Sequence, residues 1–248
     1  MIQNIVKEIN VPTNFFLGID HCINSAYTRS FSSSLGTNLQ TAATHISEIC
    51  GWKVLNDSSK EDGKIKIEGV YSDETRILID NIMTHITKSN KKSPLTQEYL
   101  DEAHSKIVDK VLTTVGQKKH NYADIIIQRE VGGKILISNI ELKLGGDLDK
   151  GKANSQRRES FEIFALLVSK YKDEIRAGKV EIKSYFATIY NKNDLLSGSE
   201  KWSSPSVTKN FTRDELLIGK DFWNHICLGD PNAFEYIMSA YHKNCTIE

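Results

Sequence analysis

The chain has 248 residues, 39% of them hydrophobic and 26% charged, and its formal net charge at pH 7 is zero. This composition is ordinary for a folded soluble protein and excludes collagen-like and low-complexity chains. No apolar run approaches the roughly 18 residues needed to span a membrane, and the N-terminus lacks the pattern of a signal peptide, so we expect a cytoplasmic protein without a membrane partner. A net charge of zero argues mildly against a nucleic-acid partner. It does not exclude one, because local basic patches matter more than the net charge.

Residue spacing excludes several kinds of site. The four cysteines are scattered without CxxC spacing, which indicates reduced thiols rather than a disulfide framework or a zinc site. The seven histidines form no HxH or HxxxH pair, so a histidine-based metal site is not expected. The GxxxxGK[ST] spacing of a phosphate-binding loop is absent, and no nucleotide cofactor is therefore expected.

Hydrophobic spacing predicts mainly helices in the first half of the chain. Apolar residues recur every three or four positions in three segments, and Lys64–Tyr71 alternates as a strand does. The chain before residue 30 has no clear pattern, and Pro94 ends a polar loop over 90–94. The three predicted helices span residues 35–50, 73–88 and 96–115.

Strands and a long helix are predicted in the second half. Two β-branched runs, 122–127 and 134–140, flank Gly132-Gly133, which is typical of a hairpin turn. Elements in the order helix, strand, strand, helix, strand are expected over about 96–190, inside a single domain, 1–248. The remaining predicted elements are a helix over 149–171, a strand over 180–190, a polar loop over 191–212 and helices over 213–218, 222–227 and 233–242.

The strongest chemical signal is an acid in one apolar strand and an acid–lysine pair at the end of the next. Strand side chains alternate faces, so Glu141 and Lys143 point the same way, and antiparallel pairing can bring Asp124 beside Glu141. Adjacent carboxylates repel unless a cation compensates, and Mg²⁺ prefers oxygen ligands. Lys143 then lies close enough to orient or deprotonate a water, or to stabilise charge on a phosphate.

This arrangement resembles the PD-(D/E)xK nuclease superfamily, whose pattern is an acid on one strand, then Glu or Asp, any residue, and Lys on the next. Here Ala123 stands where the family often has Pro. The resemblance implies a restriction-endonuclease-like fold of the α/β (α+β) class, with a mixed β-sheet flanked by helices and extra N- and C-terminal helices. It also implies that the elements over about 96–190 form the catalytic core. A second match, Glu181-Ile182-Lys183, follows no acid-bearing strand at hairpin distance and is assigned to structure.

Within this superfamily the chain looks most like a type II restriction endonuclease, a Mg²⁺-dependent enzyme that hydrolyses phosphodiester bonds in double-stranded DNA at a specific sequence. The resemblance implies that Asp124, Glu141 and the backbone carbonyl of Leu142 bind Mg²⁺, and that Lys143 completes the catalytic set. The segment 216–223 also resembles one near the C-terminus of several such enzymes. These enzymes usually act as homodimers, since a palindromic site mirrors a two-fold axis.

Basic and polar residues around the motif are candidates for DNA contacts. A basic cluster follows the second motif strand, where a DNA backbone would lie if cleavage occurs at Glu141, although a solvated helix face explains it equally well. The polar segments 191–212 and 29–38 can reach base edges. The candidate DNA contacts are Lys150, Lys152, Arg157, Asn193 and Lys201. Some related nucleases add a helix Glu to a second metal, and the corresponding candidates are Gln40 and Glu102.

Two alternatives stay open at this stage. The chain could be another nuclease of the superfamily, such as a repair or junction-resolving enzyme, or a non-catalytic DNA-binding protein of the same fold. Cleavage at one short sequence would exclude the first alternative. Convergence of Asp124, Glu141 and Lys143 around a cation site would argue against the second.

Overall fold

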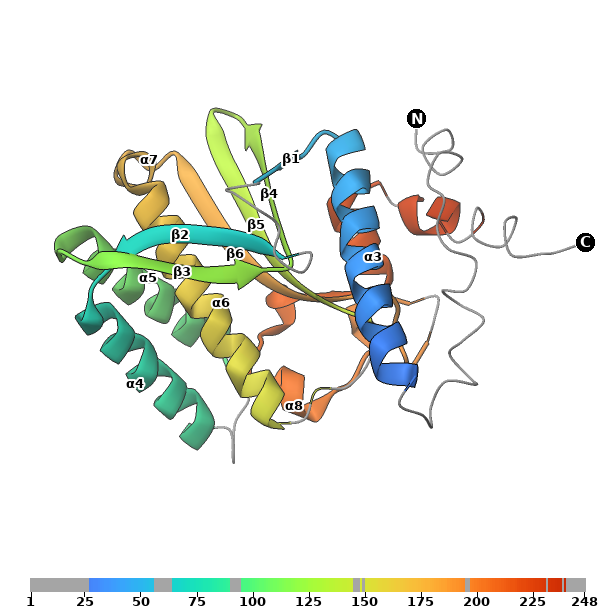
Figure 1. Ribbon diagram of the computed structural model, residues 1–248, viewed down its shortest axis with the longest axis horizontal. Coiled ribbons are helices and arrows are strands. Elements are labelled where there is room, and N and C mark those ends of the chain that lie inside the picture. Colours follow the sequence, from blue (N-terminus) through green and yellow to red (C-terminus); the bar gives the residue numbers. More distant parts are fainter. Residues whose placement is uncertain are drawn as a thin grey trace, which may run out of the picture.

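The computed structural model describes residues 27–55, 64–89, 95–144, 148, 150–194, 197–230, 232–237 and 239, with the backbone alone described for 27–35. Its core is a five-stranded sheet, a separate two-stranded ribbon and the helices that pack around both (Figure 1). The mixed α/β fold predicted from the sequence is confirmed. No helix in the described ranges is both long and apolar enough to cross a membrane.

The main sheet mixes antiparallel and parallel strands. Its first three strands pair antiparallel, and the last three pair parallel. A tight turn at Gly132 and Gly133, with φ of 60° and 78°, closes the predicted hairpin between its second and third strands. In spatial order the strands are β1 (Lys53–Val54), β4 (Ile125–Val131), β5 (Lys134–Lys143), β6 (Val180–Thr188) and β7 (Leu216–Ile218).

The ribbon consists of β2 (Ile65–Tyr71) and β3 (Gln117–Ala123), paired antiparallel along their whole length. The strand predicted over 122–127 is therefore divided, because the chain leaves the ribbon at Ala123 and enters the main sheet at Ile125. Hydrophobic patterning missed most of β3 because Gln117 to Asn121 are all polar. The single residue between the two strands is Asp124.

One long helix joins the two β layers. Helix α6 (Lys150–Lys170) contacts β2 and β3 of the ribbon, and β5 and β6 of the sheet (Figure 1). It buries the predicted inward residues Phe161, Phe164, Ala165, Leu167 and Val168. The ribbon lies so close to this helix that a Cβ atom on Gly69 would meet the Leu166 carbonyl oxygen at 2.8 Å. This close packing fixes the ribbon against α6.

The other helices cover the outer surfaces of this layered core. Helices α4 (Asp73–Ser89) and α5 (Gln97–Thr113) pack against α6, whereas α3 (Tyr27–Ile49) packs against β1, β4 and α9 (Lys220–Ile226). Thr96 caps α5 as predicted, accepting a hydrogen bond from the Tyr99 backbone N–H. A short helix, α7 (Lys172–Arg176), which the sequence patterns did not show, leads into β6.

Several predicted boundaries need correction. Helix α3 begins at Tyr27 rather than at residue 35. The helix predicted over 213–218 is wrong: Arg213–Glu215 form a 3₁₀ turn, and Leu216–Ile218 form β7, because this apolar run pairs with β6 inside the core. The polar loop over 191–212 contains two short helices, Ser199–Lys201 and α8 (Pro205–Thr208). The loop predicted over 90–94 lies outside the described residues, as does most of the tail helix beyond residue 237.

Candidate active site

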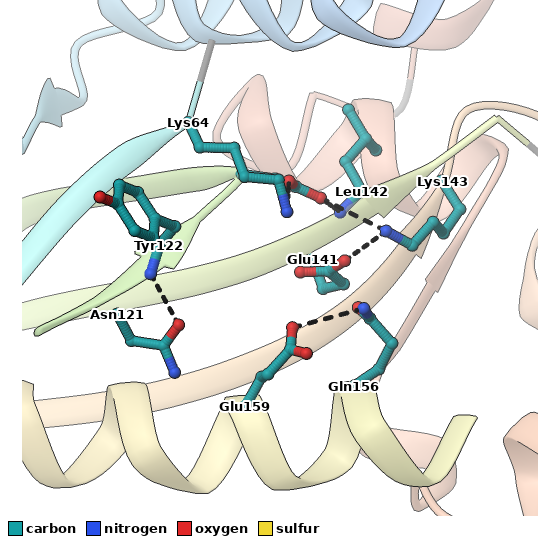
Figure 2. A network of polar contacts seen from close by, with 9 residues as sticks. Lys64, Asn121, Tyr122, Glu141, Leu142, Lys143, Gln156 and Glu159 are labelled. Carbon is teal, nitrogen blue, oxygen red and sulfur yellow. Dashed lines mark hydrogen bonds and ion pairs between the residues drawn. The ribbon is translucent and has the colours of Figure 1, made fainter. Parts of the chain in front are cut away.

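The predicted motif residues meet where the ribbon joins the main sheet (Figure 2). The antiparallel pair Ile125–Ile140 places the preceding Asp124 opposite Glu141 on β5. The ribbon pair Ile65–Ala123 likewise brings Lys64, at the start of β2, beside Asp124. Pairing within both β layers therefore builds the site.

Asp124 is a buried carboxylate whose two oxygens have different surroundings. Its side chain is 1% exposed. The Leu142 backbone N–H donates to Oδ2 at 2.9 Å, and Lys143 Nζ lies 3.8 Å from the same oxygen. Oδ1 has no hydrogen bond, and Lys64 Nζ is 3.4 Å away. A buried carboxylate oxygen without a hydrogen bond is unfavourable, and a cation at this position would compensate it.

Glu141 and Lys143 form a close ion pair in which Lys143 Nζ donates to Glu141 Oε1. Burial, and then repulsion from Asp124, raises the pKa of Glu141 to about 7. Burial acts to lower the pKa of Lys143, but attraction to Glu141 and Asp124 outweighs it, so this pKa is raised. In the absence of a metal ion, Lys143 therefore stays protonated at neutral pH.

Helix α6 adds Gln156, which the sequence patterns did not single out. Its amide lies between the carboxylates of Glu141 and Glu159 (Figure 2). An ionised carboxylate accepts but does not donate, and the amide nitrogen lies closer to a carboxylate when it faces Glu141 than when it faces Glu159 at 3.4 Å, so we assign the nitrogen to the Glu141 side. In that orientation the nitrogen donates to both Glu141 oxygens, at 3.2 Å for Oε2. Gln156 thus orients the Glu141 carboxylate from the helix side.

The donor set fits a hard divalent cation that keeps several of its waters. No group of three or more His, Cys, Asp and Glu side chains able to hold a metal gathers among the described residues. Asp124 and Glu141 would therefore supply two carboxylates, and water or substrate oxygens would complete the shell. Mg²⁺ is typically bound in this way, through one or two carboxylates together with phosphate oxygens.

One predicted DNA contact is wrong. Arg157 is fully buried, and its Nη1 donates to Glu215 Oε1 at 2.5 Å. Its guanidinium carbon lies 4.2 Å from the ring centroid of Phe161 and 5.2 Å from that of Phe211. A helix turns by about 100° per residue, so Arg157 lies on a different face of α6 from the neighbouring Gln156, and that face packs into the core.

The other predicted DNA contacts lie at the surface. Lys150 and Lys152 are exposed in the first turn of α6. Lys152 is four residues before Gln156 and so lies on the helix face that carries Gln156. In the loop, exposed Lys201 pairs with Asp194 at 2.8 Å, and the Asn193 side chain accepts from the Ser203 backbone N–H at 3.0 Å.

The structure gives no support for the two accessory ligands. Glu102 lies on an exposed face of α5 and pairs with Lys106 at 2.6 Å. Gln40 is half-buried in α3. In the described part of the chain, no contact joins either side chain to Asp124 or Glu141.

Three residues of the site were missed from the sequence: Lys64, Gln156 and Glu159. Lys64 opens an alternating Lys-Ile-Lys-Ile run and has the pattern of an ordinary strand lysine. Gln156 and Glu159 have the pattern of exposed helix residues. No local signal marks them, because contact with the motif depends on how the ribbon and α6 pack on the sheet.

The mixed sheet flanked by helices, with an acid and an acid–lysine pair on neighbouring strands, has the restriction-endonuclease-like fold expected above. A family model described as Type II restriction endonuclease, HinfI, matches residues 2–245. The chain therefore belongs to this family of type II restriction endonucleases. The family implies a nuclease of a restriction system that binds double-stranded DNA. No curated protein matches the chain.

Proposed function

We propose that this endonuclease cleaves double-stranded DNA at one short sequence in a Mg²⁺-dependent reaction centred on Asp124, Glu141 and Lys143. The observation that carries the proposal is the buried Asp124 oxygen without a hydrogen bond, next to a second carboxylate and a protonated lysine. A buried carboxylate oxygen without a hydrogen bond is unfavourable, and a bound cation would give it a ligand bond.

Asp124, Glu141 and the Leu142 carbonyl are the proposed ligands. A bound Mg²⁺ would polarise the scissile phosphate, lower the pKa of an attacking water and neutralise the leaving oxygen. The chain's own groups prepare this arrangement: the Leu142 N–H and Lys143 hold Asp124 through Oδ2, and Gln156 holds Glu141. Lys143, as a protonated donor, is suited to stabilise negative charge that develops on the phosphate.

The proposed DNA path runs along the start of α6 and over the surface loop. Lys150 and Lys152 would contact backbone phosphates next to the site. Asn193 and Lys201 lie on the exposed part of the 191–212 loop, where they could contact DNA directly. We further propose that two chains act together as a homodimer, since cutting both strands of a palindrome calls for two sites related by two-fold symmetry.

The direct test is digestion of unmethylated phage DNA with Mg²⁺ and with EDTA, using the wild type and Lys143→Ala. We expect discrete bands that need Mg²⁺, and a rate for the variant that is lower by about 10²–10³-fold or more, because one charge-stabilising donor is lost. The matched control is Lys183→Ala, which alters the second Glu-x-Lys sequence, where an exposed Lys183 pairs with Glu181 at 2.9 Å.

The controls decide between the outcomes. Lys183→Ala should cut at the wild-type rate. A Mg²⁺-dependent smear instead of bands would contradict the sequence-specific reaction and favour a repair-type nuclease. Equal loss of activity in both variants would show that the motif residues are not special.

A further inference from the structure

The site holds two lysines where the nuclease motif calls for one. Besides Lys143, the ribbon supplies Lys64, whose Nζ lies 3.4 Å from Asp124 Oδ1. The two ammonium groups lie at different oxygens of Asp124, Lys64 at Oδ1 and Lys143 at Oδ2. With two carboxylates and two ammonium groups, the cluster is already neutral, and an added divalent cation would give it a net charge of two.

The two lysines are held very differently. Lys143 is 27% exposed and donates to Glu141 while it also lies near Asp124. Lys64 is 39% exposed, and within the described part of the chain the ion pair found for it is with Asp124. A lysine at the surface with one partner and a flexible four-carbon stem can move away at little free-energy cost.

The position of Lys64 competes with a metal ion. It faces the Asp124 oxygen that has no hydrogen bond, whereas Oδ2 is held by the Leu142 N–H. A cation that binds Oδ1 must approach from the side that the Lys64 ammonium occupies, and like charges in a partly buried site repel strongly. Lys64 must therefore shift when the cation binds, and a phosphate of DNA bound at the cation is an anion with which it could then pair.

We propose that Lys64 is a displaceable counter-ion: it neutralises Asp124 in the metal-free enzyme, is displaced by the catalytic cation, and then pairs with a phosphate of the bound DNA. This proposal rests on the proposed function, because it takes Asp124 as a ligand. It makes Lys64 a positioning residue that links metal loading to DNA binding.

The first test is a calorimetric titration of the metal-free protein with Ca²⁺, a non-reactive substitute for Mg²⁺. Lys64→Met removes the competing charge and should tighten Ca²⁺ binding by about three- to tenfold. Lys64→Arg keeps the charge and should bind Ca²⁺ as the wild type does. Lys66→Met is the matched control, because Lys66 is two residues along the same ribbon and pairs with Glu68 at 2.9 Å.

The second test measures DNA affinity in Ca²⁺ over a range of salt concentrations. The Lys64→Met variant loses one phosphate contact, so it should bind DNA more weakly than the wild type. The slope of its log affinity against log salt concentration should be smaller by about one for each chain. A variant that binds the cation more tightly but DNA more weakly is not expected from simple damage to the fold, which would weaken both.

The outcomes separate this proposal from the one it rests on. If Ca²⁺ binds the wild type and Asp124→Asn abolishes this binding, the proposed metal site is supported. In that case, unchanged Ca²⁺ affinity or unchanged DNA affinity of Lys64→Met would overturn only the role proposed for Lys64. If Asp124→Asn leaves Ca²⁺ binding unaltered, the proposed metal site itself fails.

Discussion

Two clusters of buried charge lie on adjacent faces of α6, and they differ in how completely their carboxylates are hydrogen-bonded. Gln156 faces the carboxylates of the site, and the next residue, Arg157, faces the core. In the core cluster, Glu215 is 5% exposed and accepts from Arg157, from the Thr212 backbone N–H at 2.9 Å and from the Thr212 hydroxyl at 3.2 Å. Each oxygen of this carboxylate therefore accepts at least one hydrogen bond.

The cluster of the site is incomplete by comparison. One oxygen of Asp124 lacks a hydrogen bond, and repulsion between Asp124 and Glu141 persists although two lysines lie nearby. In the core cluster both oxygens of Glu215 accept hydrogen bonds within the fold, although Nε and Nη2 of Arg157 have no hydrogen-bond partner. In the site, Oδ1 of Asp124 would gain a partner on binding a cation. The comparison teaches that one buried carboxylate is neutralised and hydrogen-bonded within the fold, whereas the other keeps the capacity to bind a cation.

The largest effect should follow from breaking the core pair. Arg157→Met leaves Glu215 buried without its cation and should lower the free energy of unfolding by about 3–5 kcal/mol. Urea denaturation measures this change. Adding Glu215→Gln removes the unpaired charge and should restore most of the loss. The neighbouring Arg158→Met, which breaks a partly exposed pair with Asp80, should cost at most about 1 kcal/mol.

At the site, by contrast, a substitution should raise the free energy of unfolding. The pKa of Glu141 is raised to about 7 in the folded protein from its ordinary 4.5. The folded protein therefore binds this proton more tightly than the unfolded chain does. The resulting stabilisation is complete below pH 4.5 and is lost as the pH rises through 7. In EDTA at pH 8, Glu141→Gln should therefore be more stable than the wild type by about 1–3 kcal/mol, while it loses cleavage activity. The gain should shrink towards pH 5. Thermal unfolding at the two pH values checks this, with exposed Glu181→Gln as the control, and a destabilised variant at pH 8 would contradict it.

A smaller effect concerns His104, which lies beside the core pair and stacks on Phe164 with ring centroids 4.3 Å apart. Burial, and then the nearby Arg157 charge, lowers the pKa of His104 to about 3. The unfolded chain binds this proton near pH 6.5 and the folded protein does not, so stability falls as the pH drops from 6.5 towards 3. His104→Phe should reduce this loss by about 1 kcal/mol or more at pH 4.5, measured by urea denaturation. Exposed His45→Gln should keep the wild-type pH dependence.

The sequence predicted the parts of the site that lie close together along the chain. Asp124, the Gly-Gly turn and Glu141 are linked by one hairpin, and the alternation of side chains suffices to bring them together. The inward face of α6 was also predicted, because helical spacing of large apolar residues is a strong signal.

What the sequence could not show depends on contacts between distant elements. Polar β3 has no apolar pattern, yet its pairing with β2 delivers Lys64 to Asp124. Arg157 reads as a surface residue because nothing local reveals that Glu215, 58 residues later, will meet it in the core. Tertiary packing decides such positions, and local propensity does not.

The single-residue step from ribbon to sheet at Asp124 has a consequence for when the protein can act. Lys64 comes from one β layer, Glu141 from the other, and Gln156 from the helix that lies against both. No fragment that contains only the hairpin holds the complete constellation. A chain that is still being synthesised would thus lack the complete site. It could damage DNA only after the ribbon, the sheet and α6 have packed together.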